Sequence, residues 1–146
     1  MTEIAFHFNV PDKLAYSCRL LRKAYLSGAR VLVTAEPAVL AELDQLMWSF
    51  SPVEFVPHCR ADASQSTVAA TPVVLAESPG ASQHHGVLVN LGPGIPAGFE
   101  RFERFIEVVA RTDDDRLAAR SRWKHYTDRG YAMKRHDLAT AGEGGA

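Results

Sequence analysis

The chain has 146 residues and a formal net charge of -1 at pH 7; 47% of its residues are hydrophobic and 23% are charged. This length fits one domain, and the composition is ordinary for a soluble globular protein. The nearly balanced charge argues against a protein whose main task is to coat nucleic acid, although a local basic patch is compatible with it. No apolar run approaches the ~20 residues that a membrane-spanning helix needs.

The two cysteines, Cys18 and Cys59, form neither a metal-binding spacing nor a disulfide framework. The beginning of the sequence lacks the charged and apolar regions of a secretion signal. We therefore expect the protein to reside in the reducing cytoplasm.

The first third of the chain predicts a strand, a helix and a second strand. Residues 3–10 alternate between apolar and polar side chains, as in a strand. In residues 13–26 the apolar positions recur every three or four residues, which predicts a helix that Ser27 and Gly28 end. Residues 30–34 form a short β-branched strand. Such a βαβ unit has parallel strands and a right-handed crossover.

The middle of the chain continues this alternation. Pro37 suits the first turn of a second helix, which ends near Trp48. Residues 54–58 are predicted to be extended, and residues 59–71, rich in small polar side chains, to form a loop. Two continuous apolar runs then predict buried central strands at 72–76 and 87–91.

The last third is predicted to be mainly helical. Apolar residues follow helical steps over residues 99–109, and a second helix follows from Asp113 to Gly130. The Gly-rich residues 137–146 are expected to form a flexible tail. We therefore expect one α/β domain over residues 1–136, a Rossmann-like three-layer sandwich with a mostly parallel sheet flanked by helices.

The predicted helix after Asp113 carries a basic stripe. Arg116, Arg120 and Lys124 are spaced i, i+4 and i+8, and Trp123 lies on or beside the same side. Cations beside a large aromatic suit an acidic, extended chain with an apolar anchor. The spacing alone fits equally well a solvated amphipathic helix whose tryptophan packs on the core.

A second candidate surface runs from Trp48 to His58. It combines a large aromatic at a helix end with two prolines and Phe55. Rigid aromatic side chains of this kind serve as anchors at interfaces. A buried elbow between two elements is the other interpretation.

A glycine-rich turn resembles a dinucleotide-binding loop. Gly92, Gly94 and Gly98 follow a predicted strand in the spacing G-x-G-x-x-x-G, but Pro93 and Pro96 remove two backbone N–H donors. A small nucleotide-binding α/β enzyme is therefore the alternative function. The sequence contains no phosphate loop and no nucleophile elbow.

The histidines and acidic runs predict no metal or catalytic site. His84 and His85 are adjacent and would point in different directions, and His7 would face away from Phe6 and Phe8. His58 beside Cys59 falls short of the ligands that zinc needs. Asp113, Asp114 and Asp115 are explained as the first turn of a helix. We expect no cofactor and no catalytic constellation.

Several motifs in the same order resemble the chi subunit family of bacterial DNA polymerase III holoenzyme. The resemblance covers nearly the whole chain. Residues 59–71 lack the Gly-rich run usual in that family, and Trp123 stands where its members have Tyr. The motifs are Leu46-Met47-Trp48, Phe55-Val56-Pro57-His58, Pro72-Val73-Val74-Leu75, Arg120-Ser121-Arg122-Trp123-Lys124-His125-Tyr126 and Gly130-Tyr131.

This resemblance implies an adaptor for DNA replication rather than an enzyme. Members of the family have a nucleotide-binding-like α/β fold. They link the clamp loader, through the psi subunit, to the acidic C-terminal tail of single-stranded DNA-binding protein, which ends in an apolar residue and Phe. DNA is then contacted only indirectly. The resemblance places tail binding on Arg116, Arg120, Trp123 and Lys124, and psi binding on Trp48 and Phe55.

Overall fold

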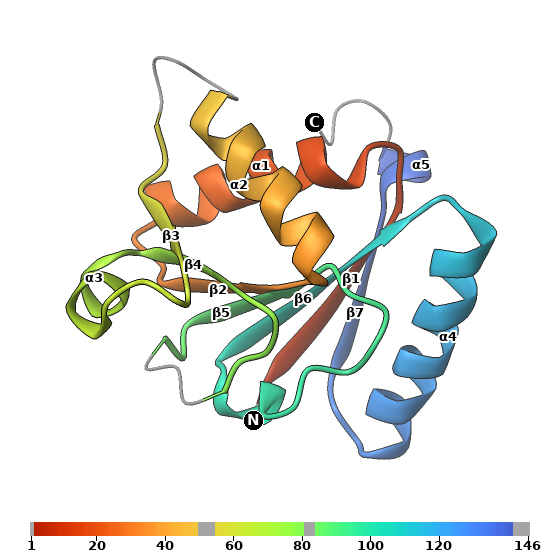
Figure 1. Cartoon of the computed structure of the whole chain (residues 1–146). Helices are drawn as coiled ribbons and strands as arrows, with labels where there is room; N and C mark the ends of the chain where they lie inside the picture. Colours follow the sequence, from red (N-terminus) through yellow and green to blue (C-terminus); the bar gives the residue numbers. More distant parts are fainter. Residues whose placement is uncertain (1, 50–54, 81–83, 142–146) are drawn as a thin grey trace.

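The described residues form a seven-stranded sheet in which every strand pair is parallel (Figure 1). The computed structural model describes residues 2–49, 55–80 and 84–141. The strand order is β3-β4-β2-β5-β6-β1-β7. The strands are β1 (Glu3–Val10), β2 (Val31–Thr34), β3 (His58–Arg60), β4 (Val73–Ala76), β5 (Val87–Asn90), β6 (Arg104–Ala110) and β7 (Met133–Asp137).

Helices cover both faces of this sheet, which confirms the predicted three-layer α/β sandwich. Helices α1 and α2 pack against each other on one face, and α4 packs on β6 from the other face (Figure 1). The helices are α1 (Lys13–Leu26), α2 (Pro37–Ser49), α3 (Gln65–Ala70), η1 (Phe99–Arg101), α4 (Asp113–Asp128) and α5 (Leu138–Ala141).

The first βαβ unit has the predicted elements, but its two strands are not neighbours. Asp12 caps α1 by accepting a hydrogen bond from the Ala15 amide at 3.1 Å, and Gly28, at φ 86°, follows its end. A left-handed φ is one that glycine adopts without steric cost. Strands β6 and β5 lie between β1 and β2, so the crossover passes over two positions that later segments fill.

The predicted helix over residues 99–109 is wrong. Only η1 is helical there, and β6 occupies a central position between β5 and β1. Five consecutive residues of β6, from Phe105 to Val109, are buried. A strand covered on both faces needs no alternation of apolar and polar residues. The apolar residues of η1 and β6 together have the spacing of a helix, although they belong to two separate elements.

The predicted loop over residues 59–71 is also wrong in part, because it contains the end of β3 and the short helix α3. Strand β7 was not predicted. Its sequence, Met-Lys-Arg-His-Asp, is polar because β7 is an edge strand, where charged residues are common. Of the predicted tail, Leu138 is buried at the start of α5, and residues 142–146 lie outside the described residues.

None of the helices in the described part of the chain is long and apolar enough to cross a membrane.

Candidate functional site

Helix α4 is fixed at its start by an aspartate of its first turn. Asp115 Oδ2 accepts hydrogen bonds from the Ala110 amide at 2.7 Å and from Lys13 Nζ at 2.9 Å. Carboxylates in the first turn also interact favourably with the positive end of the helix dipole. Gly130, at φ 82°, follows the helix end as expected. The helix is therefore held against both the end of β6 and the start of α1.

The inner face of α4 carries a buried polar network. Glu107 of β6 is 0% exposed, and its carboxylate accepts hydrogen bonds from Arg122 Nε at 3.0 Å, Tyr126 Oη at 2.6 Å and Asn90 Nδ2 at 2.9 Å. Arg122 Nη1 also donates to the Pro93 carbonyl at 2.8 Å. Burial raises the pKa of Glu107, whereas the Arg122 charge and these hydrogen bonds oppose that change. The network locks the rotation of α4 about its axis relative to the sheet.

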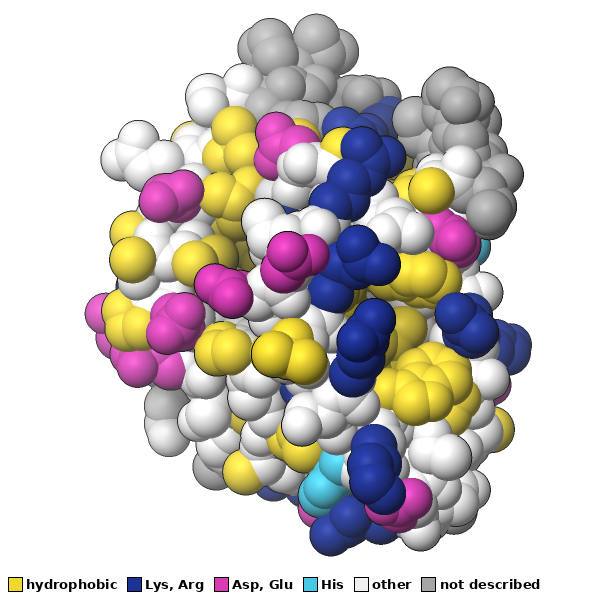
Figure 2. All heavy atoms as spheres, turned by 90° about the vertical axis from the view of Figure 1, so that its right-hand side faces the viewer, with side chains coloured by type: hydrophobic (Ala, Val, Ile, Leu, Met, Phe, Trp, Pro, Cys, Tyr) yellow, Lys and Arg dark blue, Asp and Glu magenta, His cyan; other side chains and the backbone are white. Residues whose placement is uncertain are grey.

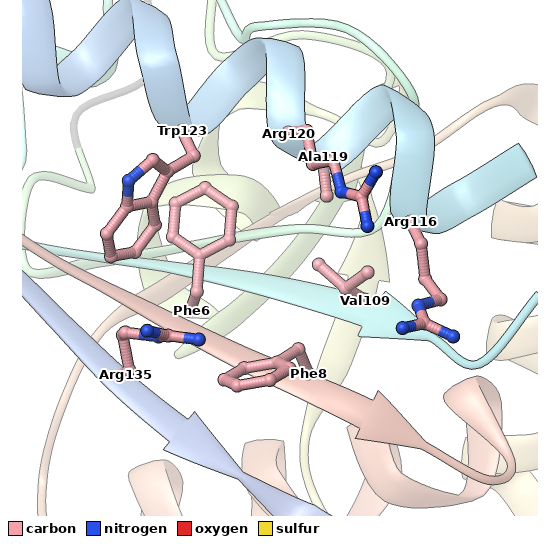
Figure 3. A pocket seen from close by; sticks show the side chains of 8 residues that line it. All are labelled: Phe6, Phe8, Val109, Arg116, Ala119, Arg120, Trp123 and Arg135. Atoms are coloured by element: carbon pink, nitrogen blue, oxygen red, sulfur yellow. The ribbon is translucent and has the colours of Figure 1, made fainter. Parts of the chain in front are cut away.

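The outer edge of α4 forms one side of an open pocket of about 350 Å³. The floor is apolar and is contributed by three elements, while guanidinium groups stand on the rims (Figure 3). The lining residues are Phe6 and Phe8 of β1, Val109 of β6, Arg116, Ala119, Arg120 and Trp123 of α4, and Arg135 of β7.

Trp123 both packs on the core and lines this pocket. Its ring meets Phe6 edge to face, with centroids 5.1 Å apart and an interplanar angle of 70°. The side chain is only half-buried. The two interpretations of the basic helix therefore do not exclude each other, because one side of the indole rests on Phe6 while the pocket remains open beside it.

The arginines around the pocket are available for a partner. Arg116, Arg120 and Arg135 are exposed, and none forms an ion pair or a side-chain hydrogen bond with another described residue. On this side of the molecule Lys and Arg side chains run in a file beside an apolar area (Figure 2). The arrangement suits an anionic chain that carries an apolar group.

Lys124 lies away from this pocket. Eight residues of a helix turn the side chain by about 80° relative to Arg116, so the i, i+4, i+8 spacing drifts off the stripe. Lys124 Nζ instead pairs with Asp128 at 2.9 Å, and the Lys124 side chain is 77% exposed. The structure thus groups Arg116, Arg120 and Trp123 but not the fourth predicted residue.

The sequence interpretation missed Arg135, Phe6 and Phe8 as pocket residues. A signal existed for the two phenylalanines, because alternation along β1 places them on the face opposite to His7. Arg135 gave no such signal, since it lies on the unpredicted β7. The register pairs Arg135 with Phe6, which brings it to the same face of the sheet.

The second predicted surface contains an exposed aromatic pair. Trp48 and Phe55 are 63% and 44% exposed, and their ring centroids are 5.0 Å apart. Both rings also lie against His58, with centroid distances of 5.1 Å and 5.6 Å, and His58 Nε2 lies 3.1 Å from Asp44 Oδ1. Residues 50–54 of this surface lie outside the described residues.

The side chain of Asn90 forms hydrogen bonds with the backbone of the glycine-rich turn. Asn90 Oδ1 accepts the Gly92 amide at 3.1 Å, and Asn90 Nδ2 donates to the Gly94 carbonyl at 3.0 Å. The pocket beside this turn is also lined by Glu36 and Glu77, whose charge repels a phosphate. The geometry therefore gives the glycines a structural role and disfavours the nucleotide-binding alternative.

Two of the histidines, His7 and His84, have partners close to them in the fold. His7 Nδ1 lies 2.5 Å from the Tyr16 hydroxyl, and His84 Nε2 lies 2.7 Å from the Thr71 carbonyl oxygen. Burial, followed by the nearby charge of His136, lowers the pKa of His7 to about 4. Within residues 2–49, 55–80 and 84–141, no three His, Cys, Asp or Glu side chains converge as metal ligands would.

A protein family and two known proteins match most of this chain. Residues 1–134 match the protein family described as "DNA polymerase III chi subunit, HolC". The DNA polymerase III subunit chi of Pseudomonas aeruginosa is 35% identical over 144 residues, which cover 94% of this chain and 98% of the relative. The corresponding subunit of Haemophilus influenzae is 28% identical over 124 residues, which cover 84% of this chain and 85% of the relative.

Proposed function

Because this chain belongs to the DNA polymerase III chi subunit family, we propose that its pocket binds the acidic C-terminal tail of single-stranded DNA-binding protein. Members of this family are accessory subunits of the replicative polymerase. The observation that supports this proposal is the combination of an apolar floor with three arginines on its rims that form no ion pair with another described residue. The tail carries the matching features, namely carboxylates and a terminal phenylalanine. On this proposal the subunit acts as an adaptor without catalytic activity of its own.

The apolar floor is large enough for the terminal phenyl ring. The pocket measures about 350 Å³, whereas an apolar cavity of ~150 Å³ is sufficient for benzene. Phe6, Phe8 and Trp123 provide ring edges and faces around that space. Aromatic side chains packed in this way prefer edge-to-face or offset contacts, which a bound phenyl ring would extend.

The expected affinity is modest and sensitive to salt. Burying the phenyl ring contributes roughly 1.5–3 kcal/mol, and each exposed ion pair with Arg116 or Arg120 about 0.2–1 kcal/mol. Together these contributions amount to roughly 2–5 kcal/mol, which corresponds to dissociation constants weaker than about 0.1 mM. Weak binding is useful for an adaptor, since several tails on a coated single strand provide avidity while each contact still exchanges.

The exposed pair of Trp48 and Phe55 is the proposed contact with the clamp loader, through a psi-like subunit. It lies at the end of α2, whereas the tail pocket lies between α4, β1 and β7. The two aromatic rings stack near each other and remain accessible, as anchors at interfaces do. The double variant Trp48→Ala, Phe55→Ala should lose binding to the clamp loader and keep binding to the tail.

Fluorescence anisotropy with a labelled acidic peptide ending in Phe tests the tail proposal. We expect Arg120→Glu to weaken binding tenfold or more, because the variant places a carboxylate on the pocket rim. Arg19→Glu is the matched control, since Arg19 is an exposed arginine on α1, which packs on the other face of the sheet. The control changes the net charge equally and should bind like the wild type.

Equal peptide affinity in the wild type and in Arg120→Glu would contradict the proposed site. A gel shift with single-stranded DNA, with and without single-stranded DNA-binding protein, shows whether this chain contacts DNA directly or only through that protein. Retardation of naked DNA by this chain alone would favour direct nucleic-acid binding instead.

A further inference from the structure

Arg135 differs from the other two arginines of the pocket in being held by aromatic rings. Its guanidinium carbon lies 5.3 Å from the ring centroid of Phe8 and 5.8 Å from that of Trp123. Both distances fall in the range of cation–π contacts. Such contacts restrict the side chain without neutralising its charge or using its N–H donors, which remain free for an anion.

Arg116 and Arg120 occupy the opposite rim and are held less tightly. They extend from α4 on one side of the apolar floor, while Arg135 extends from β7 on the other side (Figure 3). Within the described part of the chain, neither has a cation–π contact or an ion pair. Long, mobile cations suit carboxylates whose positions along a flexible chain vary.

The terminal residue of a peptide has a fixed geometry that the upstream residues lack. Its α-carboxylate and its side chain are attached to the same Cα. If the phenyl ring occupies the floor between Phe6, Phe8 and Val109, the α-carboxylate must lie at the rim beside the ring. A guanidinium that is already oriented there loses little conformational entropy on binding, and its planar fork matches a carboxylate.

We propose that Arg135 binds the α-carboxylate of the peptide's last residue, while Arg116 and Arg120 meet the carboxylates upstream. This inference rests on the proposed tail-binding function. It adds that the two rims of the pocket bind different carboxylates of the peptide. It makes β7 a part of the binding site. It also explains how the site would distinguish the C-terminus of a peptide from an acidic segment inside a chain.

The test compares two labelled peptides that differ only in a free or an amidated C-terminus. Their affinities are measured by anisotropy for the wild type, Arg135→Gln and Lys134→Gln. Lys134 is the matched control, since it is the neighbouring exposed cation of β7, faces the other side of the sheet and lies 3.5 Å from Glu3.

We expect amidation to weaken binding to the wild type and to Lys134→Gln tenfold or more. For Arg135→Gln the same change should weaken binding less than threefold, because the partner of the carboxylate is already absent. Arg120→Gln should weaken the binding of both peptides and retain the discrimination between them. Equal thermal unfolding of the variants would show that the fold is intact.

Two results would overturn the inference in distinguishable ways. If amidation costs the same factor in Arg135→Gln as in the wild type, the α-carboxylate is bound elsewhere, and the tail-binding function stands without this assignment. If the wild type binds neither peptide, the tail-binding function fails and the inference fails with it.

Discussion

Two arginines of helix α4, only two residues apart, differ completely in their surroundings. Arg122 is 2% exposed and pairs with the buried Glu107, whose carboxylate also accepts hydrogen bonds from Tyr126 and Asn90. Arg120 is exposed on the pocket rim and has no ion pair with any described residue. One helix therefore carries a charge that positions it in the fold and a charge that is free for a partner.

The comparison separates two consequences of the same residue type. A buried guanidinium whose partner is fixed contributes to the fold, because removing it leaves an uncompensated carboxylate in the core. An exposed guanidinium contributes little to folding and more to recognition. The buried ion pair also orients the exposed arginines. It fixes the rotation of α4 about its axis, and a different rotation would move Arg116 and Arg120 away from the apolar floor.

The largest expected effect comes from breaking the buried pair. Arg122→Leu should lower the free energy of unfolding by about 3–5 kcal/mol, because Glu107 is left buried without its counter-charge. Urea unfolding at neutral pH measures this difference. Arg120→Leu is the matched control and should change the free energy of unfolding by less than about 0.5 kcal/mol. Equal effects in the two variants would remove the distinction between the two arginines.

The next largest effect concerns the exposed arginines of the rim. The double variant Arg116→Ala, Arg120→Ala should weaken binding of the acidic peptide about twofold to thirtyfold, or about 0.4–2 kcal/mol in binding free energy, with an unchanged unfolding transition. The dependence of affinity on salt should also become shallower, because fewer ion pairs form. Anisotropy at two salt concentrations tests both points. A salt dependence like that of the wild type would speak against these arginines as contacts.

A similar division runs through β1, where Phe6 and Phe8 face the pocket and His7 faces α1. The pKa of His7 is about 4 in the folded chain, whereas its ordinary value, which applies to the unfolded chain, is 6.5. Between pH 4 and pH 6.5 the unfolded chain therefore binds more protons than the folded chain does. The contribution of His7 to stability is therefore complete only well above pH 6.5. It falls as the pH decreases toward 4, by about 1 kcal/mol from pH 7 to 5.5.

Urea unfolding of the wild type and His7→Gln at these two pH values measures this contribution. The wild type should lose more stability on acidification than the variant does. Parallel losses would show that protonation of His7 is not responsible.

The smallest expected effect belongs to Lys124. Its exposed pair with Asp128 has the i, i+4 spacing, which contributes about 0.3–0.5 kcal/mol to a helix. Because Lys124 does not line the pocket, Lys124→Ala should weaken peptide binding less than threefold. Its assignment to the tail site stays a prediction until that affinity is measured. A tenfold loss would place Lys124 among the contacts despite its orientation.

The parts of the fold that local signals define could be predicted from the sequence. The range of α1 was predicted from its apolar period and from Ser27 and Gly28, and it agrees with the structure, in which Asp12 caps the helix. Strand β6 was mistaken for a helix because burial on both faces removes the alternation that marks a strand. Strand β7 was missed because its edge position requires no apolar face.

The candidate site shows the same limit. Arg116, Arg120 and Trp123 lie on one helix, so their spacing places them together. The apolar floor and Arg135 come from strands distant in sequence, and only the sheet register brings them to the pocket. Lys124 was predicted to lie with the others because a four-residue step is close to one helical turn. The step is slightly longer than a turn, and over two steps the difference moves the Lys124 side chain off the stripe.

The central claim is that the pocket beside Trp123 receives the terminal phenylalanine of an acidic tail. The most direct measurement follows the indole N–H resonance of Trp123 by NMR in the Trp48→Phe variant, in which Trp123 is the single tryptophan. Titration with the acidic peptide ending in Phe should shift this resonance, and the peptide lacking that residue should leave it in place. An unmoved Trp123 resonance at peptide concentrations that saturate anisotropy would contradict the claim.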